Sequence, residues 1–163
     1  MNNKKTTVLR IFLIALCVLW MGVIFFLSAE NSAESGGRSG DISYQIVEVF
    51  TKNDTDMTDA ERQEIADDID PPLRTMAHMF CFCVLGMLYF LTARTFPVSV
   101  KIGALSSVAC ALVYAISDEL HQHFVPGRSM QLQDILVDLT GAVLGVAFIW
   151  LVMRIGKRRK AHE

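Results

Sequence analysis

Four long apolar segments constrain this chain more than any other feature of its sequence. A helix needs about 20 apolar residues to cross the hydrocarbon core of a bilayer, and each segment is close to that length. We therefore predict four membrane-spanning helices, at about residues 8–27, 74–93, 98–117 and 132–153. The first segment is the most uniformly apolar, and the last one carries Asp134 and Asp138 near its start.

Charged residues are distributed very unevenly along the 163 residues. Sixteen of the 32 charged side chains fall within residues 28–74, so the rest of the chain is strongly apolar. The apolar segments could also be buried helices of a soluble protein, but little polar sequence remains to cover such a core. We predict an all-α integral membrane four-helix bundle that forms a single domain over residues 1–163. A net charge of −2 excludes a general nucleic-acid-binding protein.

The positions of lysine and arginine predict the topology. Ten of these 15 residues lie in the N-terminal tail, around residues 94–101 and in the C-terminal tail. Basic residues favour the cytoplasmic side, so both termini are predicted to be cytoplasmic in a multi-pass plasma-membrane protein. The 28–73 and 117–131 segments then form outer loops. Cleavage of the first apolar segment as a signal peptide is an alternative, and it would leave this sidedness unchanged.

The first outer loop is predicted to contain short helices. One is amphipathic and lies on the membrane or against the bundle, with Ile42, Ile46, Val47 and Phe50 on its apolar face. The spacing of Thr58 and Glu61 is typical of a capping box, which predicts a second helix from there to about Asp68. Pro71 and Pro72 are expected to end that helix and to open the second span.

Ionisable side chains gather at the predicted outer ends of the last three spans, where they could line one polar pocket. Arg74 and His78 are four residues apart, as are Asp134 and Asp138, so each pair shares a helix face. Between these pairs lies a polar block at 117–128. Acid–base or metal chemistry is possible for His78, Asp118, Glu119, His121 and Asp138, and ligand binding is assigned to Arg74, Ser117, Gln122, Arg128 and Asp134.

A purely structural explanation stands beside this functional one. The same residues could form a paired polar network between helices, and Arg128 could pair with Asp134 or bind a headgroup phosphate. Gly141 and Gly145 have the spacing of close helix packing.

The polar residues resemble the signature of VanZ-like membrane proteins. The resemblance rests on Arg74 and His78, on the 117–128 block SDELHQHFVPGR, and on Asp134, Asp138 and Gly141, and it covers about residues 72–146. Ser28, at the end of the first span, also fits. The family often continues with Ser-Gln there, whereas this chain has Ala29 and Glu30.

The resemblance implies a four-helix bundle in a bacterial membrane with both ends inside. The name-giving member of the family is linked to low-level resistance to teicoplanin, a lipoglycopeptide antibiotic that acts on the cell envelope. The resemblance therefore implies a location and a phenotype more than a reaction.

Three mechanisms remain open from the sequence. The pocket could bind a membrane lipid, a lipid-linked cell-wall precursor or a lipoglycopeptide. It could instead be a hydrolase or transferase acting on a phosphorylated lipid-linked substrate, with a divalent metal held by His78, Glu119 and His121. Transport through a proton relay at Asp134 and Asp138 is the third, although four spans without a broken helix make a poor carrier. The oligomeric state is left open.

Overall fold

The computed structural model describes residues 3–29, 32–54, 56–125 and 131–159, and these residues form five helices and no strand. The helices are α1 (Asn3–Ser28), α2 (Ser32–Thr51), α3 (Asp59–Ala93), α4 (Val100–His123) and α5 (Leu132–Arg159). The predicted all-α class is confirmed. Among the described helices, four are long and apolar enough to cross a membrane, namely α1, α3, α4 and α5.

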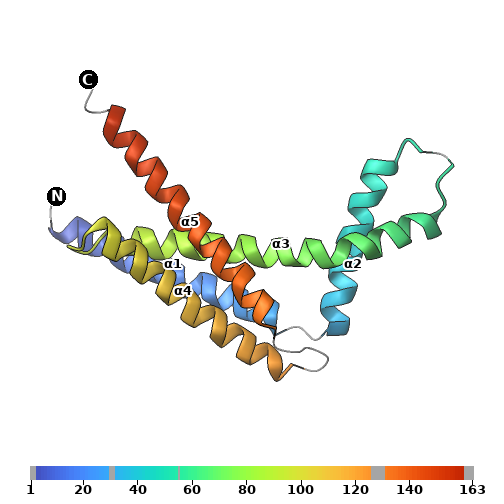
Figure 1. Ribbon diagram of the computed structural model, residues 1–163, viewed down its shortest axis with the longest axis horizontal. Coiled ribbons are helices and arrows are strands. Elements are labelled where there is room, and N and C mark those ends of the chain that lie inside the picture. The colour runs from blue at the N-terminus through green and yellow to red at the C-terminus, as the bar shows by residue number, and fades with distance from the viewer. Residues whose placement is uncertain (1–2, 30–31, 55, 126–130, 160–163) are drawn as a thin grey trace.

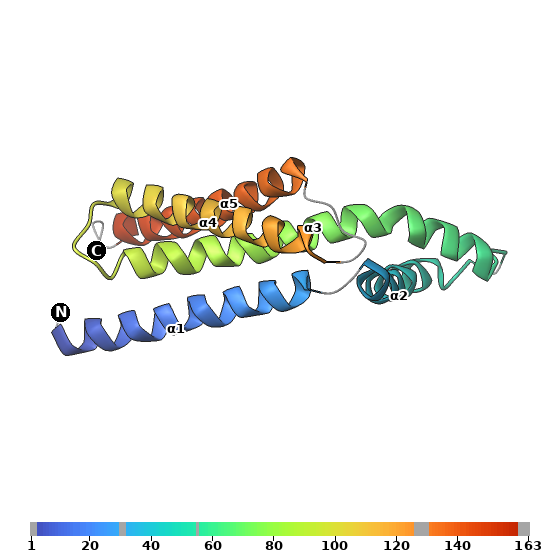
Figure 2. The same ribbon diagram turned by 90° about the horizontal axis from the view of Figure 1, so that it is seen from below.

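Helix α3 is the central element of the fold, because it contacts each of the other four helices. Its second half packs with α1, α4 and α5 as a bundle, while its first half extends beyond the bundle and is crossed by α2 (Figures 1 and 2). We call this extension, α2 with the first half of α3, the arm. Both ends of the chain lie at the end of the bundle away from the arm (Figure 1).

Helix α1 is attached to the bundle by polar tips of aromatic side chains. The indole N–H of Trp20 donates to the carbonyl oxygen of Cys81 at 2.8 Å, and the hydroxyl of Tyr114 donates to the carbonyl oxygen of Met21 at 2.6 Å. Hydrophobic burial gives little association energy between helices in lipid, so hydrogen bonds and close packing take its place. These two bonds fix α1 against α3 and α4.

The backbones of α3 and α5 approach closely because two glycines of α5 lie directly against α3. A Cβ atom on Gly141 would overlap with the carbonyl oxygen of Met79, and one on Gly145 would overlap with that of Cys83. Only a residue without a side chain allows this contact. The packing predicted from the Gly141–Gly145 spacing is therefore found between α3 and α5.

The predicted break between two helices at Pro71 is wrong. The capping box at Thr58 and Glu61 is present and begins α3. The helix then continues through Pro71 and Pro72 as one element of 35 residues.

Contacts with α2 explain this continuity. Proline removes one helical hydrogen bond and crowds the preceding turn, so a helix containing it needs external support. Ser43 of α2 donates to Asp70 on one side of the proline pair at 3.2 Å, and Arg74 on the other side donates to Ser39 at 2.7 Å. Arg74 also pairs with Asp70 across the prolines at 3.2 Å.

Helix α2 buries only part of the apolar face that the sequence predicts. Val47 is 4% exposed, whereas Ile42 and Phe50 are 48% and 85% exposed. Ser43, one turn before Val47, is fully buried because it bonds to Asp70. A polar side chain thus joins Val47 in the contact between α2 and α3.

The polar block after the third span is helical rather than a loop. Helix α4 extends to His123, so it includes the segment 117–123. The amide of Gln122 donates to Asp118 one turn earlier at 3.1 Å, and such pairs stabilise a helix end. The site residues between Ser117 and Gln122 therefore lie on a helix.

Candidate functional site

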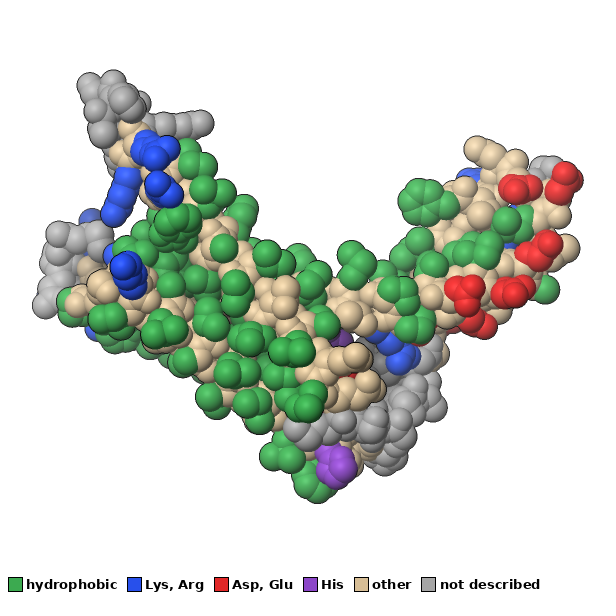
Figure 3. Space-filling view, viewed as in Figure 1, with side chains coloured by type: hydrophobic (Ala, Val, Ile, Leu, Met, Phe, Trp, Pro, Cys, Tyr) green, Lys and Arg blue, Asp and Glu red, His purple; other side chains and the backbone are tan. Residues whose placement is uncertain are grey.

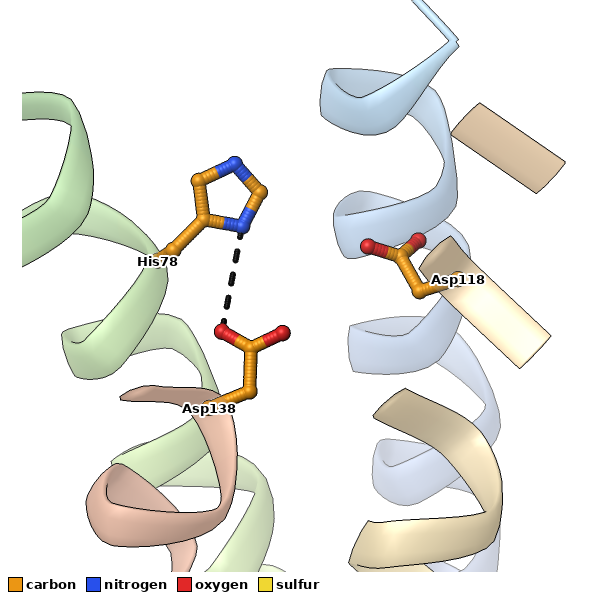
Figure 4. Close-up of side chains that lie close together, drawn as sticks. All are labelled: His78, Asp118 and Asp138. Carbon is orange, nitrogen blue, oxygen red and sulfur yellow. Dashed lines mark ion pairs between the residues drawn. The ribbon is translucent and has the colours of Figure 1, made fainter. Parts of the chain in front are cut away.

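A histidine and two aspartates from three helices meet at the end of the bundle that adjoins the arm. They are His78 of α3, Asp118 of α4 and Asp138 of α5, and each offers one metal-ligating atom within 4.8 Å of the others (Figure 4). The aspartates are 3% and 1% exposed, and the side chain of His78 is 33% exposed. We call these three residues the acidic cluster.

Asp118 is oriented by donors from α1 and α4. Its Oδ2 atom accepts hydrogen bonds from the Ser28 hydroxyl at 2.8 Å and from the Gln122 amide at 3.1 Å. Its Oδ1 atom is buried without a hydrogen-bond partner. The sequence assigned Gln122 to the site but left Ser28 out, although the VanZ-like resemblance pointed to that position.

Asp138 faces His78 across a gap. The distance from its Oδ1 atom to His78 Nδ1 is 4.0 Å, which is an ion-pair contact (Figure 4) but is too long for a hydrogen bond. This Oδ1 atom is also buried without a hydrogen-bond partner. A buried polar atom without a partner costs about 1–3 kcal/mol, and more when it is charged, so two such oxygens in one cluster require a physical explanation.

Glu119 and His121 have contacts outside the acidic cluster. Glu119 is 1% exposed and accepts the backbone N–H of Gln131, just before α5, at 2.9 Å. The imidazole of His121 stacks on the ring of Phe25 with centroids 4.3 Å apart. The structure thus groups His78 with the two aspartates, and not with Glu119 and His121 as the predicted metal ligands. The Phe25 contact had no sequence signal, since it depends on which helices are neighbours.

The predicted ligand-binding residues are more dispersed. Arg74 lies one turn before His78 in α3 and is held by Asp70 and Ser39. Ser117 is exposed and Asp134 is half-buried at the start of α5. Arg128 lies outside the described residues.

Two hollows among the described residues lie away from the acidic cluster. One, of about 400 Å³, lies between α2 and the first half of α3 and is lined by Gly37, Gly40, Asp41, Tyr44, Gln63 and Asp67, among others. The other is an open apolar groove along α1. A pocket at the cluster itself remains a prediction.

Charge is separated along the molecule. Acidic side chains gather on the arm, and lysine and arginine gather at the end where the termini lie (Figure 3). The bundle surface between them is largely hydrophobic (Figure 3). This is the pattern of a protein with one acidic and one basic aqueous face and a lipid-facing middle.

Comparisons with known proteins identify one family. The sequence model of the VanZ/LLP1 family matches residues 12–153. That range contains the acidic cluster, the whole of α3 and α4 and most of α1 and α5. Searches of curated proteins and of solved structures returned no match.

Proposed function

Because the chain belongs to the VanZ/LLP1 family, we propose that it is a bacterial plasma-membrane protein that binds a phosphorylated, lipid-linked component of the cell envelope. The binding centre is the acidic cluster together with Arg74, one helical turn away. The observation that carries the proposal is the convergence of His78, Asp118 and Asp138 from three helices around two buried carboxylate oxygens that have no hydrogen-bond partner. Ionisable groups at membrane depth are costly and usually serve a ligand or ion.

Arg74 supplies the phosphate-binding group in this proposal. Its Nε atom is engaged by Ser39 and Asp70, which fixes the plane of the guanidinium. A planar guanidinium binds phosphate through two parallel N–H donors, and we assign the terminal nitrogens to that role. The half-exposed side chain lies at the junction of the arm and the bundle, where a headgroup can reach it from the bilayer surface.

Binding is favoured over hydrolysis by what Glu119 and His121 contact. Glu119 accepts from the backbone at the start of α5, and His121 stacks on Phe25. Two of the five residues considered for acid–base chemistry therefore have contacts that stabilise the fold. Neither belongs to the group around His78.

The test is a binding assay with matched lipids. The purified full chain in nanodiscs is titrated with a long-chain isoprenyl phosphate, the corresponding isoprenol, and teicoplanin as a probe of the family phenotype. We expect the phosphate to bind at least tenfold more tightly than the alcohol. Arg74→Gln should remove most of this preference, because a charge-assisted hydrogen bond contributes about 1.5–3 kcal/mol, or roughly 10–100-fold in affinity.

The control is Arg62→Gln, which removes an arginine from the distal part of the same helix. Arg62 pairs with Asp59 in the first turn of α3, far from the acidic cluster. Its loss should leave lipid affinity unchanged. Equal binding of phosphate and alcohol, or an Arg74→Gln variant that binds as wild type does, would overturn the proposed function.

We further propose that both termini are cytoplasmic and that the arm lies outside. Support comes from the basic side chains at the end of the bundle with the termini and the acidic side chains on the arm. A green fluorescent protein fused after Glu163 should fluoresce, since it folds in the cytoplasm. Alkaline phosphatase inserted after Lys52, between α2 and α3, should be active only if the arm is outside. The reverse pattern would contradict this topology.

A further inference from the structure

We infer that the acidic cluster is a binding site for a divalent transition-metal ion, with Zn²⁺ as the best-fitting example. The ligands are an imidazole nitrogen of His78 and one carboxylate oxygen each from Asp118 and Asp138. The inference concerns the same site as the proposed function and specifies how two carboxylates can take part in binding a phosphate. It stands on four observations that are independent of any lipid.

The first observation is the geometry of the donor atoms. All three lie within 4.8 Å of one another, and Nδ1 of His78 is 4.0 Å from Oδ1 of Asp138. Zinc binds nitrogen and carboxylate oxygen at about 2.0–2.2 Å in a tetrahedron, which places its ligands roughly 3.4 Å apart. Side-chain movements of about 1 Å bring the three donors to that spacing.

The second observation is that the two aspartates lack a hydrogen bond on the side that faces the cluster. Asp118 projects from α4 toward the pair formed by His78 and Asp138 (Figure 4). The Oδ1 atoms of both aspartates are buried and have no hydrogen-bond partner. A metal ion supplies the missing interaction for both atoms at once.

The third observation is the support behind Asp118. Ser28 and Gln122 both donate to Oδ2, so that this oxygen is satisfied, while Oδ1 has no hydrogen-bond partner. Carboxylates that bind metals are typically oriented by such outer hydrogen bonds. These bonds come from α1 and α4, so three spanning helices bear ligands and a fourth holds one of them in place.

The fourth observation is charge. Two carboxylates so close together in a buried position repel each other and lose their hydration. A divalent cation balances both charges and leaves coordination positions open, as in zinc sites that bind a further ligand. In the proposed function, one open position accepts a phosphate oxygen next to Arg74.

The imidazole determines which metal fits. Histidine is a common ligand of zinc and other transition metals, whereas Mg²⁺ and Ca²⁺ prefer oxygen donors alone. We therefore expect Zn²⁺ to bind at least tenfold more tightly than Mg²⁺ or Ca²⁺. Partial exposure of the His78 side chain leaves a route by which the ion enters.

The test is a titration of the chelator-treated full chain in nanodiscs with Zn²⁺ alone, by isothermal calorimetry. We expect one ion per chain at the acidic cluster. Asp138→Asn and Asp118→Asn keep the side-chain shape but remove a negative ligand, and each should weaken zinc binding by about 100-fold or more. His78→Ala should do the same and also remove the preference for zinc over magnesium.

The matched control is His123→Ala, which removes an exposed histidine near the end of α4. It should leave the titration unchanged. Circular dichroism of each variant checks that the helices are intact. If zinc does not bind, or if folded Asp118→Asn and Asp138→Asn variants bind it as wild type does, the metal site is wrong and a proton shared by the carboxylates is the better explanation.

The two proposals fail in distinguishable ways. If isoprenyl phosphate binds equally well with and without chelator, the proposed function is retained and the role of a metal in it is overturned. If zinc binds but Arg74→Gln and the wild type have the same affinity for isoprenyl phosphate, the metal site is retained and the proposed function is overturned.

Discussion

Replacing Gly141 with alanine should both destabilise the protein and weaken metal binding at the acidic cluster. Gly141 lies one turn after Asp138 in α5, and the atom its Cβ would strike belongs to Met79, the residue after His78. The contact between the two backbones therefore sets the separation of two of the three ligands. An added methyl group must push α5 away from α3, because a backbone carbonyl cannot rotate aside.

The sign of the stability effect distinguishes this explanation from simple helix propensity. Alanine is the better helix former by about 1 kcal/mol, so propensity alone predicts a stabilised variant. Overpacking of a close contact costs about 1–3 kcal/mol or more, and the carbonyl carbon of Met79 and the backbone nitrogen of Cys83 also lie within 3.2 Å of the position that an added Cβ would take. We expect a lower melting temperature and a zinc affinity reduced by at least tenfold.

Gly156→Ala is the matched control. Gly156 lies in the same helix, and nothing is within 4 Å of an added Cβ there. Its melting temperature should stay the same or rise, and zinc binding should not change. Equal melting temperatures of the two alanine variants would show that the close α3–α5 contact at Gly141 does not contribute to stability.

The second large effect is expected at Glu119. This buried side chain accepts the backbone N–H of Gln131 and so holds the start of α5 against the end of α4. Glu119→Ala leaves that donor without its partner and opens a cavity, and should cost about 2–4 kcal/mol of stability. Glu119→Gln keeps an acceptor oxygen of the same reach and should cost less than half as much.

The pair of substitutions separates structure from chemistry. If Glu119 transferred protons in a reaction, glutamine could not replace it. Both variants would then lose that reaction, whatever their melting temperatures. If Glu119 anchors α5 instead, the melting temperature should fall slightly in Glu119→Gln and further in Glu119→Ala. Lipid binding by Glu119→Gln should then be close to that of the wild type. Ser117→Ala, at an exposed neighbouring position of α4, should be silent in both assays.

The spanning helices and the packing glycines were predictable from the sequence because both are local patterns. An apolar segment of about 20 residues predicts a spanning helix, and two glycines four residues apart predict close packing. Neither prediction requires knowing which helices are adjacent in the fold. The membership of the cluster was predictable only in part. Helical spacing placed His78 and Asp138 at helix ends, but it could not distinguish Asp118 from Glu119, its adjacent residue, because helix rotation about its axis depends on packing.

Two features required the three-dimensional structure. Continuity of α3 through Pro71 depends on bonds from Ser39 and Ser43, which lie about 30 residues away in the sequence. Ser28 was visible as a residue of the family pattern, yet its role depends on the distance between α1 and α4. Sequence patterns describe one helix at a time, whereas these contacts join two.

The unbroken length of α3 has a consequence for reach. A helix of 35 residues is about 52 Å long at 1.5 Å per residue, whereas the hydrocarbon core is about 30 Å thick. A helix of this length that crosses the core upright extends roughly 20 Å beyond it, more than twice the screening length of about 8 Å in physiological salt. Carboxylates at the tip of such a helix are largely screened from charges at the edge of the core.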